Sequence, residues 1–162
     1  MSRAFVNEDQ AAAQANPPVE RRISDQPNQV TASGYAQLQQ RVAELSAQRS
    51  ALLAHGDAVD TSQVADSERD LRYFTARLQS AQVVPAPTPG GKAQIGNRVR
   101  FLDEDGVEHA VQLVGEDEAD AAQGRVNWGS PLGRALLGAA AGDEVRWRRP
   151  AGDQTIEIVA IE

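Results

Sequence analysis

The sequence predicts an α+β protein, in which an antiparallel α-helical coiled-coil hairpin precedes a small antiparallel β domain with one short helix. Three observations lead to this prediction. Apolar side chains recur at alternating steps of three and four residues in two stretches, which is the spacing of a coiled-coil seam. A segment rich in proline and glycine follows them. Beyond it the apolar period becomes two, the period of a β-strand.

The two helical stretches are expected to pair with each other. Thr31 is placed to cap the first helix and Gly56 to end it. Asp60, with Gln63 three residues later, resembles a capping box for the second. Each helix is predicted to hold about 23–25 residues, or roughly 35 Å. The seam positions are Tyr35, Leu38, Val42, Leu45, Arg49 and Leu52, and then Val64, Ser67, Leu71, Phe74, Leu78 and Ala81.

Composition predicts the domain boundaries. Residues 1–30 show no sustained period and contain three prolines, so they are expected to form a flexible N-terminal arm. The hairpin is assigned to residues 31–84. The run VVPAPTPGG at 83–91 predicts a linker over residues 85–93. The β domain then occupies residues 94–162.

Strand and turn signals follow one another through the β domain. Val99 and Phe101 alternate with arginines, and residues 103–106 form an Asp-Gly turn before a return strand at 107–114. A short strand is expected at 125–128. Ser130-Pro131 predicts a helix start, with Leu132, Leu136 and Leu137 as the apolar face of that helix. A last hairpin joins 144–149 to 155–161.

Charge and composition exclude several classes of protein. The chain holds 16 basic and 23 acidic residues, a net charge of −7, which argues against general attraction to nucleic acid. It has no cysteine, so disulfides and thiolate sites are excluded. His55 and His109 stand alone and are expected at the surface, without a metal. No apolar run approaches about 18 residues, and no signal peptide is visible, so a cytoplasmic protein is expected.

Four segments of the C-terminal half carry a family resemblance. They read VRFLDEDGV (99–107), LVGEDEAD (113–120), SPLGRALLG (130–138) and GDEV (142–145). In this order and spacing they resemble the Gre family of bacterial transcription elongation factors, which includes GreA and GreB. Segments 71–74 and 78–84 look like the end of the family's second helix. The resemblance covers residues 31–162 and implies an FKBP-like fold for the C-terminal domain.

The resemblance also implies a partner and a mechanism. The globular domain docks on core RNA polymerase at the rim of the secondary channel, and the coiled coil enters the channel. Acidic residues at its tip help to hold a catalytic Mg²⁺, so that the polymerase cleaves the 3′ end of a backtracked transcript. The factor itself is then not an enzyme, has no cofactor of its own, and is expected to act as a monomer.

The tip residues here are Gly56-Asp57-Ala58-Val59-Asp60-Thr61, where the family pattern has Gly-Asp, two residues, and Glu-Asn. By resemblance, Asp57 and Asp60 assist the polymerase Mg²⁺. By local chemistry alone, Asp57 is a polar loop residue and Asp60 a helix N-cap. Both interpretations stay open at this stage.

Helix length argues against strong cleavage. Each helix looks about one heptad shorter than in a standard Gre factor, which removes roughly 10 Å of reach, whereas Mg²⁺ ligands lie at about 2.1 Å. The prediction is therefore a factor that occupies the channel and modulates elongation, as in short-hairpin relatives such as Rnk. The alternative is a full transcript-cleavage factor acting through Asp57 and Asp60.

Two further sets of residues have candidate contacts with the polymerase complex. Ser130 and Pro131 match the family's polymerase-facing loop, although helix-start chemistry explains them equally well; Trp128 is a candidate anchor beside them, and Gly129 replaces a GreB-type Asp. The hairpin arginines could contact nascent RNA or pair with neighbouring carboxylates. They are Arg41, Arg49, Arg69, Arg72 and Arg77, and the carboxylates are Glu44, Asp66, Glu68 and Asp70.

Two other function classes are weighed against this one. A helical-hairpin adaptor for a different partner needs only the coiled coil. A prolyl isomerase is suggested by the FKBP-like fold alone, which is a weak argument. That activity needs an aromatic pocket, and residues 85–162 hold only Phe101, Trp128 and Trp147 as aromatic residues.

Overall fold

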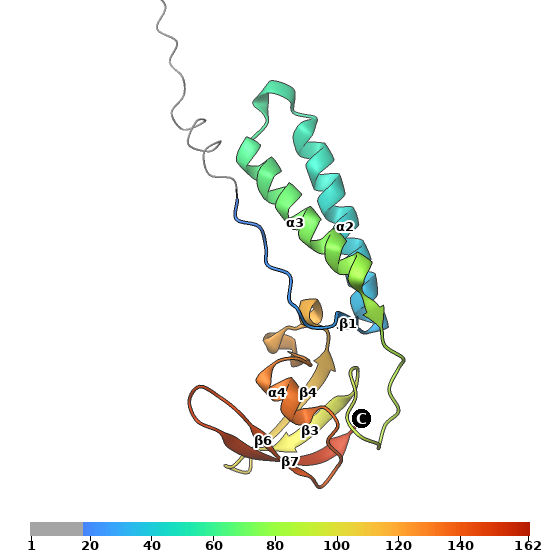
Figure 1. The fold of residues 1–162 in the computed structure, drawn as a ribbon, viewed down its shortest axis with the longest axis vertical. Coiled ribbons are helices and arrows are strands. Elements are labelled where there is room, and N and C mark those ends of the chain that lie inside the picture. Colours follow the sequence, from blue (N-terminus) through green and yellow to red (C-terminus); the bar gives the residue numbers. More distant parts are fainter. Residues whose placement is uncertain (1–17) are drawn as a thin grey trace, which may run out of the picture. The chain divides into compact units, whose positions relative to one another are not determined.

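The computed structural model describes residues 18–162 (Figure 1). Two compact units are present: the first contains residues 18–25 and Leu38–Gln79, and the second contains Gln26–Gln37 and Ser80–Glu162. The first unit is the body of a helical hairpin, and the second is built on a β-sheet. Within the described range, no helix is long and apolar enough to cross a bilayer.

The hairpin consists of α2 (Ala32–Leu53, 22 residues) and α3 (Thr61–Ser80, 20 residues). At about 1.5 Å per residue these helices are roughly 33 and 30 Å long. All twelve predicted seam positions are buried or half-buried, which confirms the predicted spacing. The two polar seam residues are satisfied across the pair: Arg49 Nε donates to Glu68 at 2.8 Å, and Ser67 Oγ donates to the Leu45 carbonyl at 3.5 Å.

A second buried row on α3 lies outside the predicted seam. Tyr73 is 9% exposed and Arg77 only 2%. The guanidinium of Arg21 lies 4.0 Å from the centre of the Tyr73 ring and 3.5 Å from Asp70. Arg21 therefore contacts α3 and covers Tyr73, which a two-helix pattern would leave exposed.

The predicted flexible arm over residues 1–30 requires correction in its second half. Residues 1–17 lie outside the described residues. Gln29–Val30 form strand β1, which pairs in parallel with β2 (Gln82–Val83), and Val30 is 1% exposed. Asn28 Nδ2 also donates to Ser80 Oγ at 3.1 Å. The low apolar content of the whole segment hid this packing, because it depends on one valine and on backbone hydrogen bonds.

The β unit contains a five-stranded sheet in the order β5-β4-β3-β7-β6. Its strands are β3 (Arg98–Leu102), β4 (Glu108–Val114), β5 (Arg125–Asn127), β6 (Glu144–Trp147) and β7 (Gln154–Ile161). The core includes Val99, Phe101, Leu113, Leu136, Ile156 and Ile158, each 2% exposed or less.

The sheet is mixed, whereas the sequence indicated an antiparallel one. β3 pairs antiparallel with β4 and β7, and β7 with β6, but β4 and β5 are parallel. The connection from β4 to β5 passes through two short 3₁₀ turns, Glu116–Glu118 and Ala121–Gln123. It brings the chain back along β4 as far as Gln112, opposite which β5 begins, so β5 runs in the same direction as β4.

The short helix α4 (Pro131–Leu136) is capped as predicted. Ser130 Oγ accepts from the Gly133 amide at 3.1 Å, and proline occupies the first turn. Leu136 is fully buried, but Leu137 is 38% exposed, so its predicted place on the apolar face is wrong. Leu137 has extended backbone angles at the C-cap, so helical spacing no longer decides where its side chain points.

The predicted linker over residues 85–93 contains no helix or strand, yet its C-terminal end packs into the β unit. Ala93 is 2% exposed, and its amide donates to the Ala139 carbonyl at 2.7 Å. The Gly90 amide donates to the Ile161 carbonyl at 2.9 Å. Proline and glycine predicted the lack of regular structure correctly, but they do not report on packing.

One buried carboxylate joins the start of α2 to the 3₁₀ turn after β4. Glu118 is 6% exposed; it accepts from the backbone amides of Thr31 and Gly115, both at 3.0 Å, and from the Thr31 hydroxyl. Thr31 Oγ1 in turn accepts from the Gly34 amide at 3.0 Å, which is the predicted N-cap. A Cβ at Gly34 would lie 2.0 Å from the Glu118 carboxyl carbon, so only glycine allows this approach.

Replacement of Glu118 by Gln is expected to lower the free energy of unfolding of the β unit by about 1–3 kcal/mol, because one carboxylate oxygen becomes an NH₂ group that faces hydrogen-bond donors. Urea unfolding followed by the fluorescence of Trp128 and Trp147 measures this. Glu144→Gln is the control, since Glu144 is exposed. Equal midpoints for the two variants would contradict the structural role of Glu118.

A second prediction concerns Asp103, in the turn between β3 and β4. His109 Nε2 lies 2.8 Å from Asp103 Oδ2. The backbone amides of Val107 and Asp105 donate to Asp103 Oδ1. The hydrogen bond from His109, followed by those amides, lowers the pKa of Asp103 from its ordinary value of 3.8. The ionised Asp103 therefore contributes fully to the stability of the folded state above about pH 4. This contribution is lost as the pH falls through the lower pKa that Asp103 has in the folded state. Asp103→Asn should reduce the acid dependence of the urea midpoint between pH 6 and about pH 2, while exposed Asp105→Asn should not.

Candidate functional site

The tip of the hairpin is a short, regular turn. α2 ends at Leu53, and a 3₁₀ turn (Gly56–Ala58) leads into an extended Val59 before α3 begins at Thr61. Backbone hydrogen bonds from Ala58 to the His55 carbonyl and from Val59 to the Gly56 carbonyl, both 3.2 Å, hold it. Every residue from 53 to 60 except Val59 is exposed, so both predicted carboxylates face solvent.

The two tip carboxylates differ in how they are engaged. Asp60 Oδ1 accepts from the amides of Ser62 and Gln63 at 3.0 and 3.2 Å, and its Oδ2 accepts from Gln63 Nε2 at 3.0 Å. This is the predicted capping arrangement. Asp57 has no hydrogen bond or ion pair with any of residues 18–162. Asp57 is therefore the tip carboxylate whose oxygens are available to a ligand.

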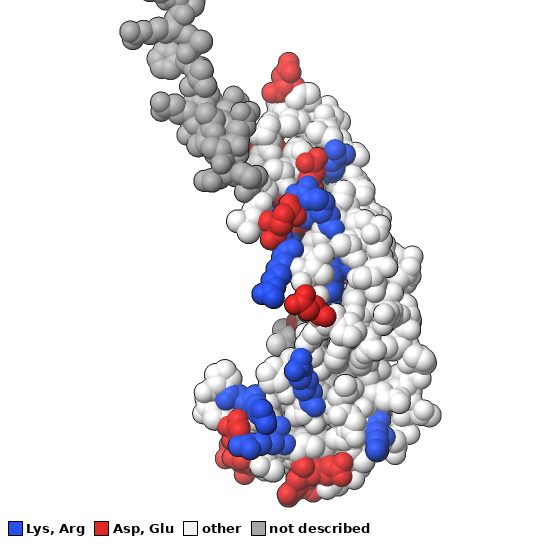
Figure 2. Space-filling model, in the orientation of Figure 1, with Lys and Arg blue, Asp and Glu red and all other residues white. Residues whose placement is uncertain are grey.

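The arginines of the hairpin pair mostly with neighbouring carboxylates. Arg41 lies 3.6 Å from Glu44, Arg69 lies 3.2 Å from Asp66, and Arg72 binds Glu20. Figure 2 shows acidic and basic side chains interspersed along the hairpin. Arg72 lowers the pKa of Glu20 through its hydrogen bond. These contacts favour the interpretation that the arginines balance flanking charge, and Arg77 is buried.

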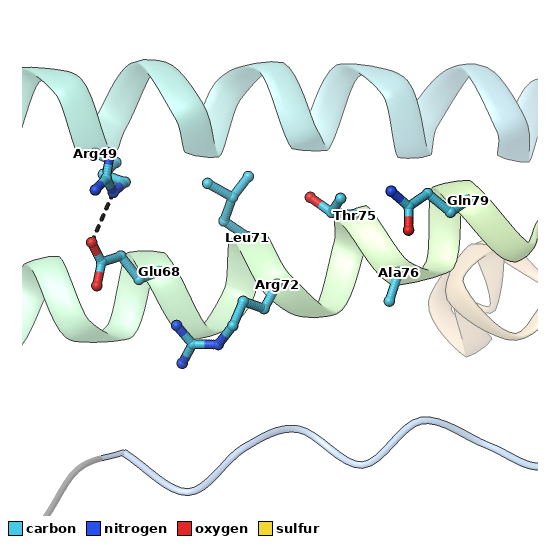
Figure 3. Close-up of a pocket in the computed structure, with 7 residues that line it drawn as sticks. All are labelled: Arg49, Glu68, Leu71, Arg72, Thr75, Ala76 and Gln79. Carbon is cyan, nitrogen blue, oxygen red and sulfur yellow. Dashed lines mark hydrogen bonds and ion pairs between the residues drawn. The ribbon is translucent and has the colours of Figure 1, made fainter.

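A groove of about 530 Å³ runs along the hairpin (Figure 3). The Arg49–Glu68 pair closes one end of it across the two helices, and Arg72 points away from α2. The remaining lining residues are Leu71, Thr75, Ala76 and Gln79, all on α3. The groove holds no cluster of catalytic groups, and we assign it no chemistry.

The second predicted site is the loop before α4. Ser130 Oγ donates to the Asn127 carbonyl at 2.7 Å and also caps α4, so Ser130 serves the loop's own structure. Pro131 is exposed, and Trp128 is half-buried with its amide bonded to the Val114 carbonyl at 2.9 Å. Of the three predicted contact residues, Pro131 is therefore the most accessible.

The side chain of Gln26 lies against Gly129, a contact that the sequence did not reveal. A Cβ at this position would lie 2.0 Å from Gln26 Oε1, and Gln26 Nε2 donates to the Gly129 carbonyl at 3.5 Å. Any larger side chain at this position would therefore require the amide end of Gln26 to move. Residues before Thr31 thus shape the loop, although the sequence placed them in a separate arm.

Sequence reasoning also missed a basic hollow beside this loop. Gly129, Pro131, Arg134, Ala135, Arg146 and Arg148 line a space of about 410 Å³. The available signal was the alternation of Arg146 and Arg148 on a predicted strand, together with the spacing of three from Pro131 to Arg134.

Comparison with known proteins identifies the family. The family model for the C-terminal domain of the transcription elongation factors GreA/GreB matches residues 88–162. GreA of Sphingopyxis alaskensis is 34% identical over 146 residues, which cover 81% of this chain and 92% of that protein. The chain belongs to the GreA/GreB family of transcription elongation factors.

Two further similarities cover a shorter stretch of the chain or have lower identity. GreB of Neisseria meningitidis serogroup B is 41% identical over 97 residues, covering 59% of this chain and 60% of that GreB. The chain thus matches about three-fifths of that relative. The solved GreA/GreB structure from Nitrosomonas europaea is 26% identical, covers 82% of this chain and 97% of its own, and has a TM-score of 0.40.

Alanine substitutions of the two tip carboxylates are expected to differ in their effect on the stability of the hairpin. Asp60→Ala should lower the free energy of unfolding of the hairpin by about 1 kcal/mol, because it removes the N-cap of α3. Asp57→Ala should leave it unchanged. Thermal unfolding followed by far-UV circular dichroism measures both, and equal losses would show that the tip is not capped as described.

Proposed function

We propose that this GreA/GreB-family protein binds core RNA polymerase at the secondary channel and modulates elongation, with little or no stimulation of transcript cleavage. The β unit docks through the loop before α4, and the hairpin enters the channel with its tip toward the 3′ end of the nascent RNA. The protein acts as a monomer and is not itself an enzyme; the polymerase performs any cleavage.

The observation that carries this proposal is the hairpin. It is a pair of antiparallel helices that ends in an exposed turn with a free carboxylate, and it belongs to a chain whose remainder matches the Gre C-terminal domain. An adaptor or a prolyl isomerase would not require an acidic tip at the end of such a hairpin.

Helix length supports channel occupation over cleavage. α2 and α3 have 22 and 20 residues. The match to the Sphingopyxis GreA spans 146 positions but uses 81% of the 162 residues, about 131. About 15 positions of that relative therefore have no counterpart here, a number close to the two heptads that the proposed shortening would remove. One heptad fewer in each helix would shorten the hairpin by roughly 10 Å.

The carboxylates fit a shared Mg²⁺ only in part. When bound at the polymerase active centre, this ion would supply charge stabilisation for phosphodiester cleavage. Asp57 has its oxygens available, but Asp60 is engaged by two backbone amides and by Gln63. A second ligand would require Asp60 to give up part of its cap. The spacing of three between the two carboxylates is what favours the alternative of a full cleavage factor.

Binding and cleavage should be measured together on stalled, backtracked elongation complexes. The wild-type chain is expected to bind core polymerase and to displace a full-length Gre factor, while adding little cleavage above the intrinsic rate. Asp57→Asn with Asp60→Asn is the matched variant, because Asn also caps helices. It should bind as tightly as wild type. Strong cleavage by wild type that this variant loses would establish the alternative function.

The effect of hairpin length on cleavage can be tested in the same assay by lengthening the hairpin. One heptad inserted into each helix beside the tip keeps the seam in register and restores roughly 10 Å. The lengthened chain should stimulate cleavage more than wild type, and the effect should depend on Asp57. Absence of polymerase binding by the wild-type chain would reject the proposed function itself.

A further inference from the structure

The basic hollow beside the α4 loop is unusual for so acidic a chain. Its volume is about 410 Å³, and three of its six lining residues are arginines, although the chain has a net charge of −7. Figure 2 shows basic side chains gathered over the part of the β unit where Figure 1 draws β6 and the loop to β7. All lining residues belong to the β unit.

The helix α4 and the strand β6, with the residue that follows it, supply the arginines of the hollow. On α4, Pro131, Arg134 and Ala135 are three and four residues apart and so share one helix face. On β6, Val145 and Trp147 pack against the core, which turns Arg146 outward. Arg148 directly follows the last residue of β6 and also lines the hollow. The hollow lies between these two surfaces.

The positive charge of the hollow is only partly compensated. Arg146 lies 2.6 Å from Asp153. Within residues 18–162, neither Arg134 nor Arg148 has a carboxylate within ion-pair distance. Both are exposed. Arg134 and Arg148 line the same hollow, and a carboxylate placed there would neutralise their charge while accepting two parallel hydrogen bonds from one arginine.

We propose that this hollow receives Asp or Glu side chains of the protein on which the β unit docks. The inference rests on the proposed function, because Pro131 belongs both to the docking loop and to the hollow. A protein partner fits better than a nucleic acid: Pro131 and Ala135 add apolar contact, whereas the net charge of the chain opposes approach to a polyphosphate. Docking at this face is then by arginine to carboxylate.

The test uses charge reversal at matched positions in the full chain. Arg134→Glu and Arg148→Glu should each raise the Kd for core polymerase at least tenfold, and their binding should depend less steeply on salt. Lys92→Glu makes the same change of charge at an exposed site in the same unit, outside the hollow. It should change the Kd less than twofold. Far-UV circular dichroism and urea midpoints confirm that each variant is folded.

The outcomes separate this inference from the proposed function. If wild type binds polymerase and the arginine variants bind equally well, the inference is wrong and the proposed function stands. If wild type does not bind polymerase, both are wrong. A single-stranded oligonucleotide is titrated in parallel. Loss of oligonucleotide binding in the arginine variants, with polymerase binding unchanged, would assign the hollow to nucleic acid and overturn the inference.

Discussion

The hydrogen bonds of the buried Glu118 carboxylate hold together segments that are far apart in the sequence. Glu118 accepts from Thr31 and from Gly115, and Thr31 caps α2. A buried carboxylate is costly unless donors surround it, so the group fixes each segment that supplies a donor. The start of α2 and the 3₁₀ turn after β4 depend on it. Gly34 and Gly115 leave room for it, since a Cβ at either would lie within 3 Å of the Glu118 side chain.

The length of the hairpin decides how its tip can be used. Asp57 and Asp60 keep the carboxylate spacing of the family tip. A carboxylate can act as a ligand only at bonding distance from the metal ion. Helix length decides how far the tip reaches, at about 1.5 Å per residue. Asp60 is also committed to capping α3. A residue pattern can therefore resemble the tip of a family while helix length and capping decide what those residues can reach.

The loop before α4 and the hollow beside it illustrate how separate local rules combine. Ser130 and Pro131 start a helix, β6 places its apolar residues inward, and Gln26 from the N-terminal side occupies the space above Gly129. None of these features is unusual alone. Together they place three arginines beside a loop that carries no acidic side chain at residues 128–131.

The sequence by itself determined the features that depend on neighbours within a few residues. These are the helical seams, the Thr31, Asp60 and Ser130 caps, the turn before β4 and the approximate bounds of the strands, because periodicity and capping are local. Only the tertiary structure decided the parallel β5, the burial of Val30, Tyr73 and Arg77, and the basic hollow. Each of these depends on contacts between segments distant in sequence, and no local pattern records which segment will arrive to cover a residue.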